Sequence, residues 1–365
     1  MIVRSLIIYL LSAFLTSVFA CRLWAVCTKS GFALSTLPSA HKNHILDDLD
    51  GYFEQSKSMP NGWALLNYDS IPDQATTSIY RSSFTAYSDS LAYWGQVNTM
   101  IDSGQNRIGL GHLRIATSGA DNIPNPHPWM FYHNGHSFSL IHNGTINKSK
   151  LYNIITNNGS DLSWLDQHNP NTFSEHLWSS SEGWSNVVDS NLLLLLIMQH
   201  YMESENLYEA IQLSLSKLMD SGINANQINV IISDGFELFI FGGSNGLSIV
   251  ESSAYFSVMT EPNTYNQNSD LTWTGILENE LIIINKNGIS RVPDFTDQSI
   301  NDDSIPPSLF VLKPAFPNPF NGEVTIPFQI EPITKSAQLS IFSILGENIY
   351  NTIITQDQLR QGFIR

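Results

Sequence analysis

Cys21 is the residue of this chain best placed to act as a nucleophile, because a secretory cleavage site directly precedes it. Residues 1–20 have a basic start at Arg4, an apolar run over 6–19 and a small last residue, Ala20, a pattern typical of a signal peptide. Cleavage after Ala20 would leave Cys21 with a free α-amine beside its thiol. An amine with an ordinary pKa of about 7.7–8.0 can accept the thiol proton.

Other fates of Cys21 also fit its position. A buried structural cysteine is common. Bacterial lipoproteins likewise begin with a lipid-modified cysteine after a small residue, although Phe19 stands where those signals usually carry a small residue. The apolar run is shorter than the ~20 residues that a spanning helix needs, so we expect no membrane span in the mature chain. On position alone, nucleophile, lipid anchor and inert cysteine stay open.

Arg114 is a second chemical candidate, in the segment GHLRIATSG at 111–119. This segment predicts a strand that carries Arg114 into a turn with Thr117, Ser118 and Gly119. A guanidinium presents a planar fork of donors that suits a carboxylate, so Arg114 could hold the carboxyl group of an amino acid. A surface salt bridge is the alternative for an isolated arginine.

Asn143 and Gly144 end the hydrophobic strand expected in FSLIHNGTI at 138–146. A side-chain amide next to a glycine N–H can donate two hydrogen bonds to an oxyanion, and one such donor contributes about 3–4 kcal/mol in known enzymes. Asn-Gly is also an ordinary hairpin turn. In VDSN at 188–191, Asp189 is either the N-cap of an apolar helix or a carboxylate that binds a substrate ammonium.

In this order, the clusters resemble the class II glutamine amidotransferases, the N-terminal-nucleophile (Ntn) hydrolases that begin with cysteine. That family has a Cys-Arg start, an H-x-R-x-A-T-x-G strand, an N-x-H-P turn, an H-N-G turn and D-[ST]-E at a helix start. The matching segments are CRLWAV (21–26), HLRIATSG (112–119), NPHPW (125–129), HNG (142–144) and DSN (189–191). SDGFELFIFGG (233–243), SVMTEP (257–262) and TWTGILENELIIINKNG (272–288) resemble the closing strands of stand-alone members, so the resemblance covers about 21–292.

The resemblance implies an α+β fold, a four-layer αββα Ntn-hydrolase sandwich, over residues 21–292. It also implies the chemistry of Cys21, which would attack the side-chain amide of glutamine with its own α-amine as the proton carrier. Asn143 and Gly144 would form the oxyanion hole. No cofactor and no metal is implied.

The resemblance further implies how a substrate is held. Arg114, helped by Thr117, would bind the α-carboxylate of glutamine, and Asp189 would bind its α-ammonium. Asn191 departs from the family's D-[ST]-E motif by removing a carboxylate, and the segment 70–106 contains little that matches the family.

The function expected is that of an exported glutamine amidotransferase-like amidohydrolase acting on glutamine or a γ-glutamyl amide. A thioester at Cys21 would be hydrolysed to glutamate, with ammonia released. Two alternatives remain: an N-terminal-cysteine amidase for a different amide, which would not need Arg114 and Asp189, or a non-catalytic surface module with a lipidated or unprocessed Cys21.

Composition supports an exported globular protein and excludes some partners. The chain has 365 residues, 42% hydrophobic content and a net charge of −16, so we expect neither nucleic acid nor an anionic membrane surface as a partner. Its two cysteines, Cys21 and Cys27, give no disulfide framework. If a strand separates them they lie about 20 Å apart, too far for a disulfide.

Short strands and two helices must position the site. Apolar or β-branched runs bounded by turn residues predict strands at 22–26, 62–68, 108–114, 138–142, 227–233, 238–242, 254–260 and 281–285. Helices are predicted at 190–203 and 207–221 from length and a 3.6-residue apolar period. His127, His133 and His136 lack the spacing of a zinc site.

The C-terminal part differs in composition. Residues 293–308 are polar and contain prolines, and predict a linker. Residues 309–365, with LKPAFPNPFNGEVTIPFQI and AQLSIFSILGENIY, predict a small β-sandwich module. They resemble the sorting domains of type IX secretion, although the segment looks incomplete. We therefore expect an exported, secreted or cell-surface protein that contacts the secretion machinery through this segment.

Overall fold

The computed structural model describes residues 21–71, 74–119, 127–243, 246–262 and 271–297, and in the C-terminal segment 311–312, 315–316, 323–329, 337–342, 348–361 and 363–364. The predicted signal peptide, 1–20, lies outside the described residues. So does most of the predicted linker, from 298 onward.

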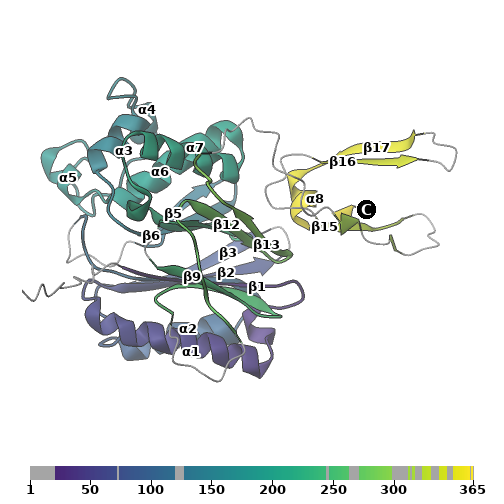
Figure 1. The fold of residues 1–365 in the computed structure, drawn as a ribbon. Coiled ribbons are helices and arrows are strands. Elements are labelled where there is room, and N and C mark those ends of the chain that lie inside the picture. Colours follow the sequence, from purple (N-terminus) through teal and green to yellow (C-terminus); the bar gives the residue numbers. More distant parts are fainter. Residues whose placement is uncertain are drawn as a thin grey trace, which may run out of the picture.

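Two antiparallel sheets lie face to face at the centre of the main domain (Figure 1). The first sheet has the order β11 (Thr274–Gly275), β9 (Leu247–Glu251), β10 (Tyr255–Thr260), β1 (Arg22–Thr28), β4 (Asn106–Leu113), β2 (Trp63–Ile71) and β3 (Gln74–Ser82). The second has the order β13 (Gly288–Val292), β12 (Glu280–Asn285), β8 (Glu237–Gly242), β7 (Asn229–Ser233), β6 (His136–Asn143) and β5 (Trp129–His133).

Helices cover the outer face of each sheet (Figure 1). The first sheet is covered by α1 (Ser39–Gln55) and α2 (Ser90–Asp102), near the short 3₁₀ turns η1 (Leu34–Thr36) and η2 (Ser56–Ser58). On the second sheet lie α3 (Lys148–Ile155), α4 (Ser163–Gln167), α5 (Ser181–Asn186), α6 (Asp189–Ser204) and α7 (Leu207–Asp220), with the turn η3 (Ala225–Gln227). The four-layer αββα arrangement predicted from the sequence is confirmed.

Strand β1 shows how the sequence produces these layers. Successive side chains of a strand point to opposite faces. Leu23, Ala25 and Cys27 therefore join the core between the two sheets, whereas Trp24 and Val26 pack under α1 and α2. Both faces of the strand are buried, which explains its nearly continuous apolar sequence.

The eight predicted strands and both predicted helices are present, with ends shifted by a few residues. Helices α1 to α5 were not predicted, nor were strands β3, β5, β9, β11 and β13. In α1 the buried residues are Ile45, Leu49, Tyr52 and Phe53, a one-sided spacing in an otherwise polar sequence. A narrow apolar stripe is sufficient here because the sheet covers only that side of the helix.

The predicted start of the linker at 293 is wrong. Phe295 is fully buried in the core of the second sheet and its helices, and its backbone carbonyl accepts a hydrogen bond from Gln212 Nε2 at 3.1 Å. Thr296 is also bonded to Asn279. The main domain therefore extends at least to residue 297, because an aromatic side chain after β13 fills the core beside α7.

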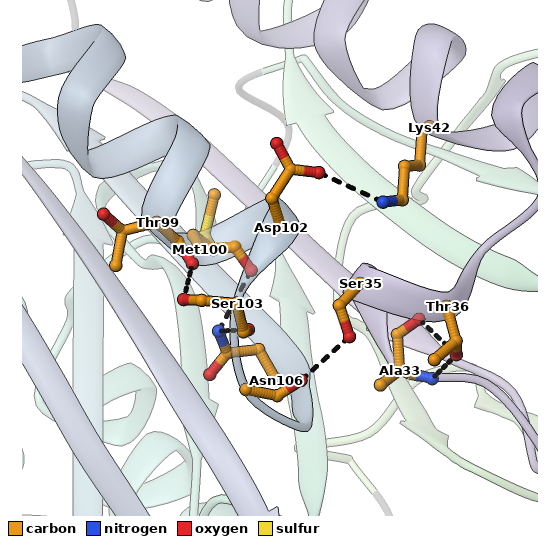
Figure 2. A network of polar contacts seen from close by, with 10 residues as sticks. Ala33, Ser35, Thr36, Lys42, Thr99, Met100, Asp102, Ser103 and Asn106 are labelled. Carbon is orange, nitrogen blue, oxygen red and sulfur yellow. Dashed lines mark hydrogen bonds and ion pairs between the residues drawn. The ribbon is translucent and has the colours of Figure 1, made fainter.

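A polar network fixes the start of β4 at the end of the sheet remote from Arg114 (Figure 2). Asn106 Nδ2 donates to the carbonyl oxygens of Met100 and Ser103, both at 3.0 Å, and its Oδ1 accepts from Asn67 Nδ2 at 2.6 Å. One buried side chain thus bonds the last carbonyls of α2 and ties β4 to β2, which fixes where β4 begins.

The C-terminal segment forms small sheets of its own. One has the order β14 (Val311–Leu312), β15 (Ile326–Gln329) and β18 (Phe363–Ile364), and the other pairs β16 (Ala337–Phe342) with β17 (Asn348–Ile354). A short helix, α8 (Gln356–Gln361), lies between β17 and β18. Four described residues form the core of this C-terminal segment: Phe328, Ile354, Leu359 and Ile364.

Candidate active site

Cys21 directly precedes β1, the strand between β10 and β4 in the first sheet. Its Sγ lies 3.4 Å from both the backbone nitrogen and the carbonyl oxygen of Ile115. The thiol can therefore accept one hydrogen bond and donate another to the same residue. Cys21 is partly buried and Cys27 is buried, and neither forms a disulfide.

The surroundings of Cys21 hold its thiol in the protonated form. Burial raises the pKa of the thiol, and the negative charge of Asp189 adds to this effect. The hydrogen bond from Ile115 and the positive charge of Arg114 act in the opposite direction. Since the raising effects dominate, the pKa of the thiol lies above its ordinary value.

Arg114 is the first residue after β4 and is only 3% exposed. Its backbone nitrogen donates to Gly62 O at 2.9 Å, and its Nη2 donates to Ser118 O at 3.2 Å. The predicted alternative, a surface salt bridge, is wrong because the side chain is buried. The guanidinium is therefore buried, and its positive charge acts on the Cys21 thiol.

Asp189 is the first residue of α6 and is 2% exposed. The N-cap alternative is wrong, because Val188 occupies that position. The carboxylate instead accepts from the backbone nitrogens of Ile146, at 2.8 Å, and Ser190, at 2.9 Å. An ionised carboxylate has about four acceptor positions, so Asp189 is fixed in place with capacity left for a further donor.

Asn143 is the last residue of β6, and Gly144 follows it in the turn that leads to α3, so the two do not form the hairpin that Asn-Gly can signal. Asn143 is 1% exposed, and its Oδ1 has no hydrogen-bond partner among the described residues. A Cβ atom on Gly144 would lie 2.1 Å from Gln227 O. Only glycine fits this close approach, which sets the backbone direction immediately after Asn143.

His142 and Ser190 were not predicted as site residues, yet they connect the two halves of the site. Ser190 Oγ lies 2.8 Å from His142 Nδ1, and Gln227 O lies 2.9 Å from His142 Nε2. A carbonyl oxygen only accepts, so Nε2 carries a hydrogen and, in a neutral ring, Nδ1 accepts from the serine hydroxyl. The turn after β6 and the start of α6 therefore share one buried imidazole.

Smaller contacts complete the surroundings. Thr117 is exposed and accepts a hydrogen bond from Thr145 Oγ1 at 2.9 Å, which joins the turn after β4 to the turn after β6. Asn191, the departure from the family motif, accepts from the backbone nitrogen of Asn171 at 2.9 Å. Its amide thus anchors the loop before α5.

The structure brings the predicted clusters together at one end of the two sheets. They come from the start of β1, the end of β4, the end of β6 and the start of α6, which are far apart in sequence. Within the described residues, no group of three or more His, Cys, Asp or Glu side chains could hold a metal ion. Nor is any helix of the described part long and apolar enough to cross a membrane.

Comparisons with known proteins concern the two parts of the chain separately. Residues 314–362 match the secretion system C-terminal sorting domain family, which confirms the resemblance predicted for this segment. A search of curated protein sequences found no match to the chain.

Among solved structures, the chain resembles a glutamine phosphoribosylpyrophosphate amidotransferase from B. subtilis, at 18% identity and a TM-score of 0.45, and an allosteric regulatory enzyme of purine biosynthesis, at 18% identity and 0.48. Each match covers 77% of this chain and 50% of the other, so the chain spans half the length of these proteins. A glutamine aminotransferase class-II domain protein from Silicibacter pomeroyi matches at 14% identity and a TM-score of 0.42, over 74% of this chain and 98% of that one.

Proposed function

We propose that the chain is an exported glutamine amidotransferase-like amidohydrolase in which Cys21 is the nucleophile. The observation that carries the proposal is the surroundings of the Cys21 thiol. Its Sγ contacts the backbone next to Arg114, and the charges of both Arg114 and Asp189 act on it. A cation and an anion that both lie near the thiol match the carboxylate and ammonium of an α-amino acid.

Substrate binding follows from these charges. Arg114 holds the α-carboxylate, with Thr117 beside it, and Asp189 accepts the α-ammonium through its remaining lone pairs. These two contacts direct the side-chain amide of glutamine or of a γ-glutamyl compound toward Cys21. The substrate is thereby held for attack at the amide carbon.

The reaction then has two stages. The α-amine of Cys21 takes the thiol proton, and the thiolate attacks the amide carbon while Asn143 and Gly144 donate to the oxyanion. The C–N bond breaks, the amine returns its proton to the leaving nitrogen, and ammonia departs from a thioester at Cys21. Water attacks the thioester, which gives glutamate and restores the thiol.

The protonated state of the thiol fits this route. Because burial raises the pKa of Cys21, a base on the same residue is useful, and an α-amine is available only after cleavage between Ala20 and Cys21. The sorting segment at 314–362 supports export, with the secretion machinery as its partner.

The test compares mature protein that begins at Cys21 with a Cys21→Ala variant and with precursor that retains residues 1–20. Glutamine, and glutamine with its α-carboxylate blocked as an amide, are the substrates, and glutamate and ammonia are quantified. We expect release only from the mature parent protein and only from free glutamine. Equal turnover of the blocked substrate would favour an amidase of different specificity, and equal turnover by intact precursor would refute the mechanism.

A further inference from the structure

The backbone around Ile115 is held from both edges. On one edge, its N–H and carbonyl oxygen face Cys21 Sγ at 3.4 Å. On the other edge, Arg114 N donates to Gly62 O at 2.9 Å and Asn61 N donates to Arg114 O at 3.2 Å. Alternate residues of an extended strand direct their backbone groups to opposite edges, so Ile115 can serve the thiol while its neighbours are bonded elsewhere.

Asn61 makes the last contact on that second edge. Its Oδ1 accepts from the backbone nitrogen of Ala116 at 3.0 Å, two residues beyond Arg114, whose backbone bonds Gly62 and Asn61. Gly62 has φ +110°, a backbone conformation that favours glycine, and residues 60–61 before it form a turn. The Asn61 backbone nitrogen bonds Arg114 O on this edge, and the Asn61 side chain supplies the acceptor for Ala116 N.

We propose that Asn61 is a positioning residue for the nucleophile: its side-chain carbonyl holds Ala116 so that the Ile115 amide stays directed at Cys21 Sγ. The inference rests on the proposed function, in which Cys21 is the reacting thiol. Asn61 has no part in the chemistry itself, because its contacts are to the backbone that carries Arg114 and Ile115.

The expected consequence concerns the thiolate of Cys21. Burial raises the pKa of this thiol, and the hydrogen bond from Ile115 opposes the increase. A backbone N–H is a stronger donor to a thiolate than to a thiol, because the acceptor is then charged. If the segment 114–116 loosens, the thiolate loses this donor and the thiol pKa rises further.

The experiment measures the rate of iodoacetamide alkylation against pH in mature protein that begins at Cys21. Peptide mass spectrometry assigns the label to Cys21 or to the buried Cys27. For Asn61→Ala we expect the midpoint at Cys21 to rise by about one pH unit, which corresponds to about a tenfold slower reaction near neutral pH. The maximal rate at high pH should be close to that of the parent, because the thiol remains in the same place.

Asn67→Ala is the matched control. Asn67 also lies on the β2–β4 pair, where its Nδ2 donates to Asn106 Oδ1 at 2.6 Å, but at the opposite end from Cys21. This variant should lower the melting temperature and leave the alkylation midpoint unchanged. If Asn61→Ala behaves in the same way, Asn61 only stabilises the fold and the inference is overturned.

A second measurement remains informative if Asn61→Ala folds poorly. Asn61→Asp keeps an acceptor for Ala116 N, so hydrogen exchange of the peptide spanning 114–117 should stay slow in this variant; fast exchange would overturn the inference. The readouts also separate the two proposals. A parent protein that does not hydrolyse glutamine leaves the alkylation result intact, whereas an unshifted midpoint in an active enzyme overturns only the role of Asn61.

Discussion

Asn143→Ala is the sharpest test of the proposed oxyanion contact. The side chain is 1% exposed at the end of β6, and its Oδ1 has no partner among the described residues. Asn143→Ala therefore breaks no hydrogen bond to Oδ1. We expect residue 143 to keep its backbone pairing with Asn229 on β7. We expect the free energy of unfolding to fall by about 1 kcal/mol or less.

The expected effect on catalysis is much larger. A donor that acts when charge develops on the substrate oxygen is worth about 2.7–4 kcal/mol, so kcat should fall about 10²–10³-fold. KM should change little, because the contact is made mainly in the transition state. Steady-state glutaminase kinetics and denaturant unfolding, measured on the same preparation, give both quantities.

Asn229→Ala provides the matched control. Asn229 pairs with Asn143 across β6 and β7, is fully buried, and accepts from Gly243 N at 2.6 Å through its Oδ1. Its loss leaves a buried N–H unsatisfied, which costs about 1–3 kcal/mol of stability, with kcat close to the parental value. The opposite pattern, in which Asn143→Ala is the unstable and active variant, would remove Asn143 from the active site.

Three further outcomes are expected. Arg114→Ala should lower kcat/KM for glutamine far more than for a substrate with a blocked α-carboxylate; equal losses would make Arg114 structural. Asp48→Asn should stabilise the protein at pH 8 but hardly at pH 5. Burial raises the pKa of Asp48 to about 7, although a hydrogen bond from Ser257 opposes the increase, and the pKa in the unfolded chain is about 3.9. The parent protein therefore loses stability as the pH rises from about 4 to 7, because the folded state must release this proton. A melting-temperature difference that is constant with pH would contradict this. Asn106→Ala should lower the free energy of unfolding by about 2–4 kcal/mol, because two carbonyls and one side-chain amide lose their partner. Denaturant unfolding measures this loss, with Asn43→Ala at an exposed position as the control. A loss no greater than that of the control would argue against the network.

The sequence predicted the inner layers of the fold better than the outer ones. Strands such as β1 and β6 are buried on both faces, so their apolar runs are visible without any structure. Helix α6 is equally apolar because it is buried on nearly all sides. Helix α1 has only a narrow buried stripe. Polar residues on its solvent side make the helical period of apolar residues difficult to recognise in the sequence.

Asn-Gly occurs twice with different results, which shows a limit of local patterns. Asn134 and Gly135 both have positive φ and form the hairpin between β5 and β6, as the dipeptide predicts. Asn143 and Gly144 instead connect a strand to a helix. Glycine is required at position 144 because the Gln227 carbonyl oxygen leaves no space for a side chain there, and no local sequence rule contains that contact.

The segments around Cys21, Arg114, Asn143 and Asp189 are separated by tens of residues, so their proximity in the fold could be predicted only from the family resemblance. The hydrogen bonds that hold these segments together could not be predicted at all. His142 precedes Asn143 on β6, and Ser190 follows Asp189 on α6, so the 2.8 Å contact between His142 and Ser190 joins the two proposed binding elements directly. Gln227 O bonds the other ring nitrogen and also limits Gly144. The start of α6, which carries the proposed ammonium-binding carboxylate, and the turn after β6, which carries the proposed oxyanion donors, are therefore joined through one imidazole, and neither can move relative to the other without breaking a buried hydrogen bond.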